Sequence, residues 1–591
     1  MSKEKKHIYQ VFTRLFGNTN TNNIPWGTIS DNGVGKFSDF NEKALKEIRD
    51  LGITHIWYTG VPHHALINDY TSIGISNDHP DVVKGRAGSP YAVKDYYNVN
   101  PDLANDPANR LEEFRALIER THNVGLKLII DIVPNHVARK YEGKSNPPGV
   151  KDFGAQDNTS LCYHINNTFY YNPGEKFKTP VWLHDYVPLG KSNEPKTKEF
   201  DEFPAKWTGN GSRLSQPHFY DWYETVKLNY GINPEGHKDF PCLPEGFENK
   251  DFREHFAFWS DKVLPNTWLK FRDIALYWLE MGVDGFRYDM AELVPVEFWS
   301  FMNSSIKMKN DEALLLAEVY EPYQYRNYIH LGKMDYLYDK VEMYDGLKRI
   351  MQGHGTTDDI SATQFHLGDI EHHMLHFLEN HDEQRIASPE FAGDAKKAMP
   401  AMVTSACIST SPTMIYFGQE VGEPADENAG FGSHSRTSIF DYIGVPAHQR
   451  WMNNKKFDGG QLSIHEKELR DFYKRLLNFC LNSPAILGEY REVHNHNRAY
   501  TPWYNHHVFS FVRYSSTEKL LILCNFHPQD SFGFELGITG DIIGSWALQD
   551  GVYSLVDQLY GHYKTKLNVN FGYGKVRIDI PALTSFLLKL E

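Results

Sequence analysis

Three acidic side chains follow three short apolar runs in the chain. The run from Gly285 to Asp289 ends in an arginine, a tyrosine and an aspartate, and the run from Leu314 to Glu318 ends 29 residues later (318 − 289). A third run ends in His381 and Asp382. Since about thirty residues make one strand–helix–strand unit, we expect these carboxylates at the C-terminal tips of parallel strands in one sheet. Two carboxylates that face one bond, one as nucleophile and one as acid, are the equipment of a retaining glycosidase.

Alternating apolar runs and helical patterns predict the scaffold that would position these groups. Helical spacing is clear in residues 41–50, 111–118, 268–278 and 469–480,. The run 126–133 is continuously apolar, as expected of a strand buried on both faces. Eight strands with intervening helices predict an α/β fold, a (β/α)8 TIM barrel. The expected strands are 8–12, 53–58, 126–133, 285–289, 314–318, 335–338, 375–381 and 413–417.

Two stretches depart from this alternation. From His136 to about residue 250 the chain is rich in Asn, Gly, Pro, Lys and aromatic residues and shows little periodicity, which predicts an insertion domain after the third strand,. Beyond about residue 488, short strand-like runs between turns predict a C-terminal antiparallel β-sandwich,. The predicted domains are the barrel (1–136 and 251–487), the insertion (137–250) and the β-sandwich (488–591).

Composition narrows the class of protein. A chain of 591 residues is expected to form two or three domains, and its net charge of −15 argues against nucleic-acid or anionic-membrane partners,. The N-terminus lacks the apolar stretch of a signal peptide, and no apolar run is long enough to span a membrane, so a cytoplasmic location is expected,. Five cysteines, none close to another in sequence, suggest neither a disulfide framework nor a CxxC metal site,.

Four ordered segments follow the predicted strands: Asp131 to His136, Gly285 to Asp289, Ala317 to Tyr320 and Phe377 to Asp382. They resemble the signature segments of the third, fourth, fifth and seventh barrel strands in the α-amylase family, glycoside hydrolase family 13. The resemblance extends from about residue 8 to the C-terminus, loosely in the insertion. It implies retaining hydrolysis of α-1,4-glucosidic bonds in starch, glycogen or maltodextrins, with an α-glucan as partner.

The resemblance assigns roles to the acidic residues. Asp289 would be the nucleophile that attacks the anomeric carbon, and Glu318 the acid/base that protonates the leaving oxygen and later activates water. Asp382 would hold sugar hydroxyls and favour the distorted ring of the transition state. Arg287 lies two residues before Asp289 on the same strand, so both side chains face one side, and its cation would keep Asp289 ionised.

Four further residues would bind the substrate. By resemblance, His136 and His381 would donate hydrogen bonds to hydroxyls of the cleaved sugar. Tyr91 lies in a segment that resembles the family's aromatic platform under that sugar. Arg385 follows His381 by four residues and would orient Asp382.

A structural calcium is the only non-protein group that the resemblance suggests, and the chemistry requires no cofactor. Asn135 resembles a calcium ligand of many α-amylases, although its amide could equally brace the loop. In many members the third and fourth positions after the nucleophile are a lysine, which touches the aglycone sugar, and a histidine, whose carbonyl helps to bind calcium. Here they are Glu292 and Leu293. This departure weakens the calcium inference and leaves the aglycone subsites open.

Two alternatives to hydrolysis stay open at this point. A transglycosylase or sugar isomerase of the same family would use the same covalent intermediate and differ only in what intercepts it. A catalytically inactive glycan-binding or transporter-associated relative would usually lack one of the three carboxylates, and all three are present here.

Overall fold

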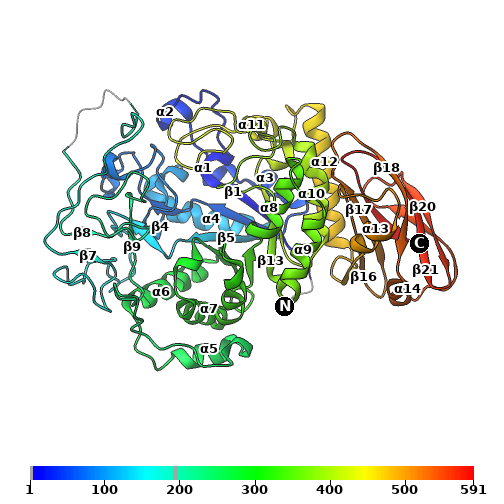
Figure 1. The fold of residues 1–591 in the computed structure, drawn as a ribbon. Coiled ribbons are helices and arrows are strands. Elements are labelled where there is room, and N and C mark those ends of the chain that lie inside the picture. The colour runs from blue at the N-terminus through cyan, green and yellow to red at the C-terminus, as the bar shows by residue number, and fades with distance from the viewer. Residues whose placement is uncertain (1–3, 191–197) are drawn as a thin grey trace.

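The structure, a computed structural model, describes residues 4–190 and 198–591. Eight parallel strands form a closed barrel in the order β1-β14-β13-β12-β11-β10-β5-β2 (Figure 1). The first strand pairs with both β2 and β14, which closes the ring. The predicted barrel is therefore confirmed. Its strands are β1 (His7–Phe12), β2 (His55–Thr59), β5 (Lys127–Ile132), β10 (Gly285–Tyr288), β11 (Leu314–Ala317), β12 (Tyr336–Tyr338), β13 (Met374–Phe377) and β14 (Thr413–Tyr416).

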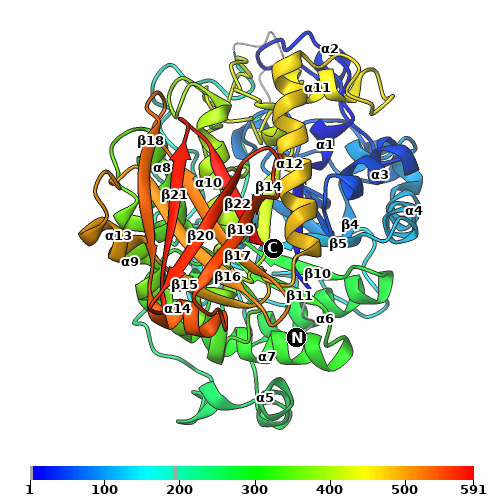
Figure 2. The same cartoon turned by 90° about the vertical axis from the view of Figure 1, so that its right-hand side faces the viewer.

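Helices connect the strands and pack around the barrel (Figures 1 and 2). Local capping explains several of their limits: the Asn41 side chain accepts the backbone N–H of Ala44, and Ser463 and Glu466 form a capping box,. Gly282, with φ of +110°, ends another helix in a conformation that favours glycine,. The main helices are α3 (Glu42–Asp50), α4 (Arg110–Asn123), α6 (Asn266–Met281), α7 (Val296–Lys309), α8 (Asp345–Met351), α9 (Asp358–Leu367), α10 (Ala398–Cys407) and α12 (Ile464–Asn482).

The strand register brings the first two acidic residues to one level. Tyr288 of β10 pairs with Ala317 of β11, so the next residues, Asp289 and Glu318, leave the two strands side by side. On the other edge of β10, Arg287 pairs with Asp131 of β5. Parallel pairing thus places charged groups from three neighbouring strands at the C-terminal face of the barrel, where barrel enzymes carry their active sites.

Two long segments, one after β2 and one after β5, extend from the C-terminal face of the barrel. An antiparallel hairpin of β3 (Pro62–His64) and β4 (Val93–Val99), which the sequence did not reveal, follows β2. The insertion after β5 contains only short strands joined by long irregular segments, in agreement with its poor periodicity. Its strands are β6 (His136–Ala138), β7 (Tyr171–Asn172), β8 (Ala205–Lys206) and β9 (Thr225–Lys227), and β6 pairs with β9. Figure 1 shows β7, β8 and β9 on the opposite side of the barrel from the C-terminal strands.

The C-terminal region is a single antiparallel sheet of eight strands, ordered β15-β16-β17-β22-β19-β20-β21-β18 (Figure 2). Alternate side chains of β16 and β17 face two different cores: Phe511 and Ile522 pack into the core of the barrel, whereas Val512 and Leu521 pack into a separate one. The predicted antiparallel domain is confirmed, and its eight strands form one continuous sheet. The strands are β15 (Glu489–Glu492), β16 (Val508–Tyr514), β17 (Lys519–Asn525), β18 (Phe532–Ile538), β19 (Gly551–Asp557), β20 (Lys564–Asn570), β21 (Tyr573–Ile580) and β22 (Ser585–Leu590).

Short helices α1 (Thr13–Phe16), α2 (Ile29–Asn32), α5 (Phe252–Trp259), α11 (Pro446–Met452), α13 (His494–Tyr500) and α14 (Gly540–Ser545) complete the fold. Across residues 4–190 and 198–591, no helix has the length and apolar character that crossing a membrane requires.

Candidate active site

Arg287 lies at the centre of the acidic cluster and contacts both proposed catalytic carboxyls. Its Nη1 donates to Asp289 at 3.0 Å and its Nη2 to Glu318 Oε2 at 2.9 Å, while Asp131 lies 3.4 Å from Nη1. The remaining Nε donates to the hydroxyl of Tyr338 at 3.2 Å. The guanidinium is fully buried. Since its donors form a rigid planar fork, it fixes the two carboxyls of neighbouring strands relative to each other.

Glu318 receives two more hydrogen bonds. The backbone N–H of Met290 donates to Oε2 at 2.8 Å, and the hydroxyl of Tyr320 donates to Oε1 at 2.5 Å. Met290 follows the nucleophile position and adopts a left-handed conformation with φ of +43°, a costly conformation for a residue with a side chain,. Both oxygens of Glu318 are therefore oriented by neighbouring groups.

Glu292, one of the residues that departs from the family pattern, supports this arrangement. Its carboxylate accepts the backbone N–H groups of Tyr320 at 2.9 Å and Glu321 at 3.0 Å. The loop that carries the Tyr320 hydroxyl to Glu318 is thus held by a carboxylate at the position where many relatives have a lysine.

Asp289 is a buried residue, only 6% exposed. Burial and the adjacent Glu318 carboxyl raise the pKa of Asp289 well above its ordinary value, while Arg287 opposes the shift. The Glu318 carboxyl thus favours the protonated form of Asp289, whereas Arg287, which donates to both carboxyls, favours the ionised form that attack requires,.

His381 links Asp382 to the barrel wall. The amide of Gln10 on β1 can only donate to His381 Nδ1, at 2.7 Å, so the neutral ring carries its hydrogen on Nε2, which lies 3.0 Å from Asp382 Oδ2,. The Tyr91 hydroxyl also contacts Nε2, and the two rings stack with centres 5.3 Å apart. Desolvation opposes ionisation of Asp382, but His381, assisted by Arg287, lowers its pKa.

His136 lies on the side of the insertion. Burial, together with the ammonium groups of Lys227 and Lys84, lowers the pKa of His136 to about 3, so the ring is neutral at neutral pH. The Asn135 amide nitrogen donates to Nδ1 at 3.0 Å, which leaves the hydrogen on Nε2,.

These residues surround a cavity of about 400 Å³ at the C-terminal face of the barrel. Five residues predicted from the sequence line it together: Tyr91, His136, Asp289, Glu318 and Asp382. Arg287 and His381 lie directly behind them through the contacts described above. The full lining is Lys84, Ser89, Tyr91, His136, Trp222, Glu224, Thr225, Asp289, Met290, Glu318, Tyr320, Asp382, Glu383, Arg436, Ile439 and Phe440.

Arg385 does not take the predicted position. Its Nη1 forms an ion pair with Glu379 at 2.9 Å and also donates to the carbonyl of Phe417, while Nε donates to Thr437. Residues 381–385 form an irregular turn rather than a helix, so an offset of four residues does not bring Arg385 to Asp382. The prediction that Arg385 orients Asp382 was wrong; Arg385 braces the loop after β13 from behind.

Three contacts at the site were missed in the sequence. Gln10 is a polar residue inside an otherwise apolar strand, which was the available signal. Tyr320 lies in the segment that carries Glu318, but nothing in its spacing reveals the hydrogen bond. Trp57 donates from Nε1 to Asp131 at 2.9 Å and thereby holds the third acidic neighbour of Arg287.

Asn135, expected as a calcium ligand, makes contacts with protein groups. Its amide oxygen accepts a hydrogen bond from the ammonium of Lys227, and its amide nitrogen donates to the carbonyl of Gly209 at 2.9 Å. The oxygen that would bind the ion therefore already faces a cation. Throughout the part of the chain that the structure describes, no group of three or more His, Cys, Asp or Glu side chains could hold a metal ion.

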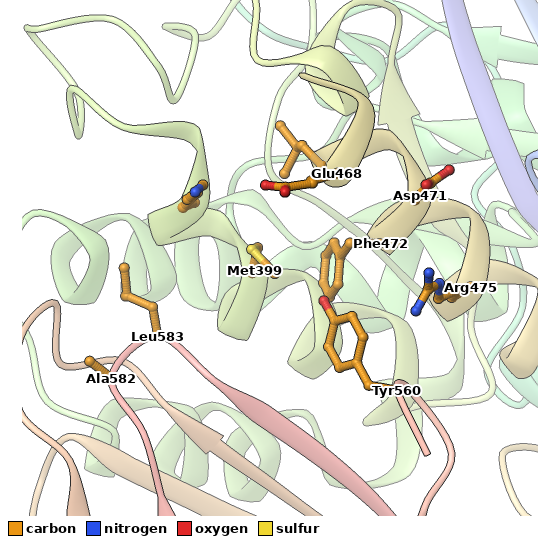
Figure 3. A pocket seen from close by; sticks show the side chains of 10 residues that line it. Met399, Glu468, Asp471, Phe472, Arg475, Tyr560, Ala582 and Leu583 are labelled. Carbon is orange, nitrogen blue, oxygen red and sulfur yellow. The ribbon is translucent and has the colours of Figure 1, made fainter. Parts of the chain in front are cut away.

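A second, larger hollow of about 560 Å³ lies where α12 meets the C-terminal domain (Figure 3). The carboxylates of Glu468 and Asp471 and the guanidinium of Arg475 line it, and all three side chains are exposed. Tyr560 lies across from them, with its ring centre 5.4 Å from the Arg475 guanidinium. The charged groups of this hollow do not converge on one another as those of the barrel cavity do.

Comparison with known proteins agrees with this geometry. The family description "Alpha amylase, catalytic domain" matches residues 10–189 and 259–461, which is more than half of the chain. The chain therefore belongs to the α-amylase family, glycoside hydrolase family 13.

Individual relatives are distant. Neopullulanase 2 of Thermoactinomyces vulgaris is 21% identical over 439 residues, which cover 70% of this chain and 56% of that protein. The intracellular maltogenic amylase of Bacillus subtilis is 21% identical, with 70% and 55% covered. Alpha-amylase 3 of Dictyoglomus thermophilum is 22% identical, with 89% and 86% covered. The chain thus spans little more than half the length of the first two relatives.

Among solved structures, the noncanonic maltogenic alpha-amylase AmyB of Thermotoga neapolitana superposes with a TM-score of 0.60 at 16% identity. The superposition covers 99% of this chain and 98% of that one. At 16% identity, this superposition shows that the two proteins share a fold.

Proposed function

We propose that the protein is a retaining α-glucoside hydrolase that cleaves α-1,4-glucosidic bonds of α-glucans such as starch, glycogen or maltodextrins. The observation that carries the proposal is the bridging of Asp289 and Glu318 by one buried arginine at the tips of adjacent barrel strands. Membership of the α-amylase family and the activities for which its relatives are named, maltogenic amylase and neopullulanase among them, support the substrate class.

In the proposed first step, the Asp289 carboxylate attacks the anomeric carbon while Glu318 gives its proton to the departing glycosidic oxygen. A covalent bond between the sugar and Asp289 forms as the glycosidic bond breaks. In the second step, Glu318 takes a proton from water, and the water oxygen displaces Asp289 from the sugar. Two inversions give net retention of configuration.

Neighbouring groups would stabilise charge in both steps. Arg287 holds the Asp289 carboxylate in position for attack, and Tyr320 keeps Glu318 directed into the cavity. Asp382 and His381 would bind hydroxyls of the cleaved sugar, with the ring of Tyr91 beneath it. His381 and Arg287 favour the ionised form of Asp382, and this carboxylate would in turn stabilise the positive charge of an oxocarbenium-like sugar beside it,.

The test is a product profile combined with anomer analysis. Purified protein would be incubated separately with maltoheptaose, soluble starch and maltose. Chromatography would follow product length, and proton NMR would identify the first anomer released. We expect shorter maltooligosaccharides with α-configuration at the new reducing end. A β-anomer as first product would overturn retention, and no turnover of maltoheptaose, starch or maltose would overturn the substrate class.

The same experiment separates hydrolysis from transglycosylation. Products longer than maltoheptaose, or trehalose from maltose, would replace the hydrolase by a transferase or isomerase that uses the same intermediate. Cyclomaltodextrin glucanotransferase of Bacillus sp. (strain 1011) is among the relatives, at 22% identity, so this outcome is a defined alternative.

A further inference from the structure

A lysine side chain lies where the barrel, the insertion and the loop after β10 meet. The ammonium of Lys227, the last residue of β9, donates to the amide oxygen of Asn135 and lies 3.4 Å from the carbonyl oxygen of Leu293. Within residues 4–190 and 198–591, no carboxylate lies within ion-pair distance of this ammonium. Lys227 is therefore a cation whose hydrogen-bond acceptors are neutral oxygens.

The backbone around Lys227 ties the three segments together. Lys227 pairs with His136 in the β6–β9 ladder, and the N–H of Leu228 donates to the carbonyl of Asn135 at 3.1 Å. The Asn135 amide nitrogen completes the junction by bonding Gly209 of the insertion. Because His136 lines the cavity, the geometry of this junction reaches the substrate side of the barrel.

The donor set does not fit a calcium ion. Calcium takes six to eight oxygen ligands, normally including carboxylates. Here the amide oxygen of Asn135 is already used by Lys227, and the carbonyl of Leu293 faces the same ammonium. A divalent ion beside this ammonium would meet a like charge at short distance.

We propose that the ammonium of Lys227 takes the place of a structural cation at this junction, so that the insertion is fixed to the barrel without calcium. A covalently attached ion costs no binding step and cannot be removed by a chelator. The inference does not rest on the proposed function, since it concerns the folding of the junction alone.

The first test needs no variant. The unfolding temperature, Tm, of the full-length protein would be measured at neutral pH after exhaustive treatment with EDTA, and again with millimolar calcium chloride. We expect the same Tm in both. A Tm that falls by several degrees in EDTA and is restored by calcium would overturn the proposal.

The second test removes the charge in Lys227→Met. We expect a lower Tm and faster limited proteolysis within residues 137–250, because the buried amide oxygen of Asn135 and the carbonyl oxygen of Leu293 lose their donor,. Lys227→Arg keeps a cation and should be cleaved more slowly than Lys227→Met. The arginine variant can also be compared directly with the wild type if the methionine variant folds poorly. Cleavage of Lys227→Met at the wild-type rate would contradict the proposal.

Lys5→Met is the matched control. Lys5 is also buried and its ammonium donates to two neutral oxygens, the carbonyls of Ser409 and Ser411, but it lies at the other end of the barrel beside β1. We expect Lys5→Met to lower Tm without accelerating cleavage in the insertion. Equal acceleration in both variants would show general destabilisation and overturn the local role of Lys227.

Discussion

Two hollows of this protein, the one beside α12 and the cavity of the barrel, contain similar kinds of side chain in different settings. The hollow beside α12 is the larger, about 560 Å³ against about 400 Å³, and contains two carboxylates, an arginine and a tyrosine (Figure 3). The cavity of the barrel is also lined by carboxylates, an arginine and tyrosines, but there Asp289 and Glu318 are buried and both accept hydrogen bonds from the buried Arg287 directly behind them.

The difference shows that burial and convergence, rather than size, mark a reactive site. Exposed charges are screened by water and salt, so they interact only weakly with one another. Where water is excluded, neighbouring charges perturb one another, and the pKa of Asp289 moves well above its ordinary value because of burial and Glu318,. Matched substitutions in the two hollows can test this distinction.

The largest contrast is expected for a carboxylate-to-amide exchange. Asp289→Asn removes the proposed nucleophile and should lower kcat on maltoheptaose by about 10³-fold or more. Glu468→Gln makes the same chemical change in the hollow beside α12 and should leave kcat within about twofold, as surface substitutions usually do. Steady-state kinetics on both variants would check this, and equal losses would remove the distinction between the hollows.

A smaller contrast is expected for arginine-to-lysine exchange. Arg287→Lys keeps a positive charge but cannot bridge Asp289 and Glu318 together, and misplacing the pair should cost about 100-fold in kcat/KM. Arg475→Lys should have almost no effect. If Arg287→Lys retained most of its activity, charge alone would suffice and the bridging geometry would be irrelevant.

The smallest expected effect is a shift in pH dependence. Asp289 must be ionised to attack, and since its pKa is raised, activity should fall as the pH drops through a value above the ordinary aspartate range of about 4,. Glu318→Gln removes the neighbouring carboxyl, so the acid limb of kcat/KM should move to lower pH. The variant would be assayed on a glucoside whose leaving group needs no acid. An acid limb that stays at the same pH, or that moves to higher pH, would contradict the coupling of the two carboxyls.

Strand periodicity and family segments predicted the parts of the site that lie at strand tips. Asp289 and Glu318 follow apolar runs one repeat apart, so the barrel register alone brings them together. Tyr320 and Gln10 could not be assigned in this way, because their roles depend on side-chain direction across neighbouring strands. Arg385 was misplaced because an offset of four residues implies proximity only in a helix.

Contacts between residues far apart in the chain were the other kind of feature that the sequence could not predict. Lys227 is 92 residues from Asn135 in sequence, inside an insertion with little periodicity, so its contact could be found only in the folded chain. In the C-terminal domain, β21 alternates regularly between buried and exposed residues, as a half-buried strand does, whereas β19 has only two buried residues among seven and no regular alternation.

Closure of the barrel has a consequence for the newly synthesised chain. His7 of β1 pairs with Thr413 of β14, so 406 residues (413 − 7) must be translated before this edge of β1 finds its partner. Until then its backbone donors and acceptors can pair with strands of other molecules. Contacts so distant in sequence also slow folding. Yield on expression should therefore depend on chaperones that shield strand edges during translation more than on the stability of the finished barrel.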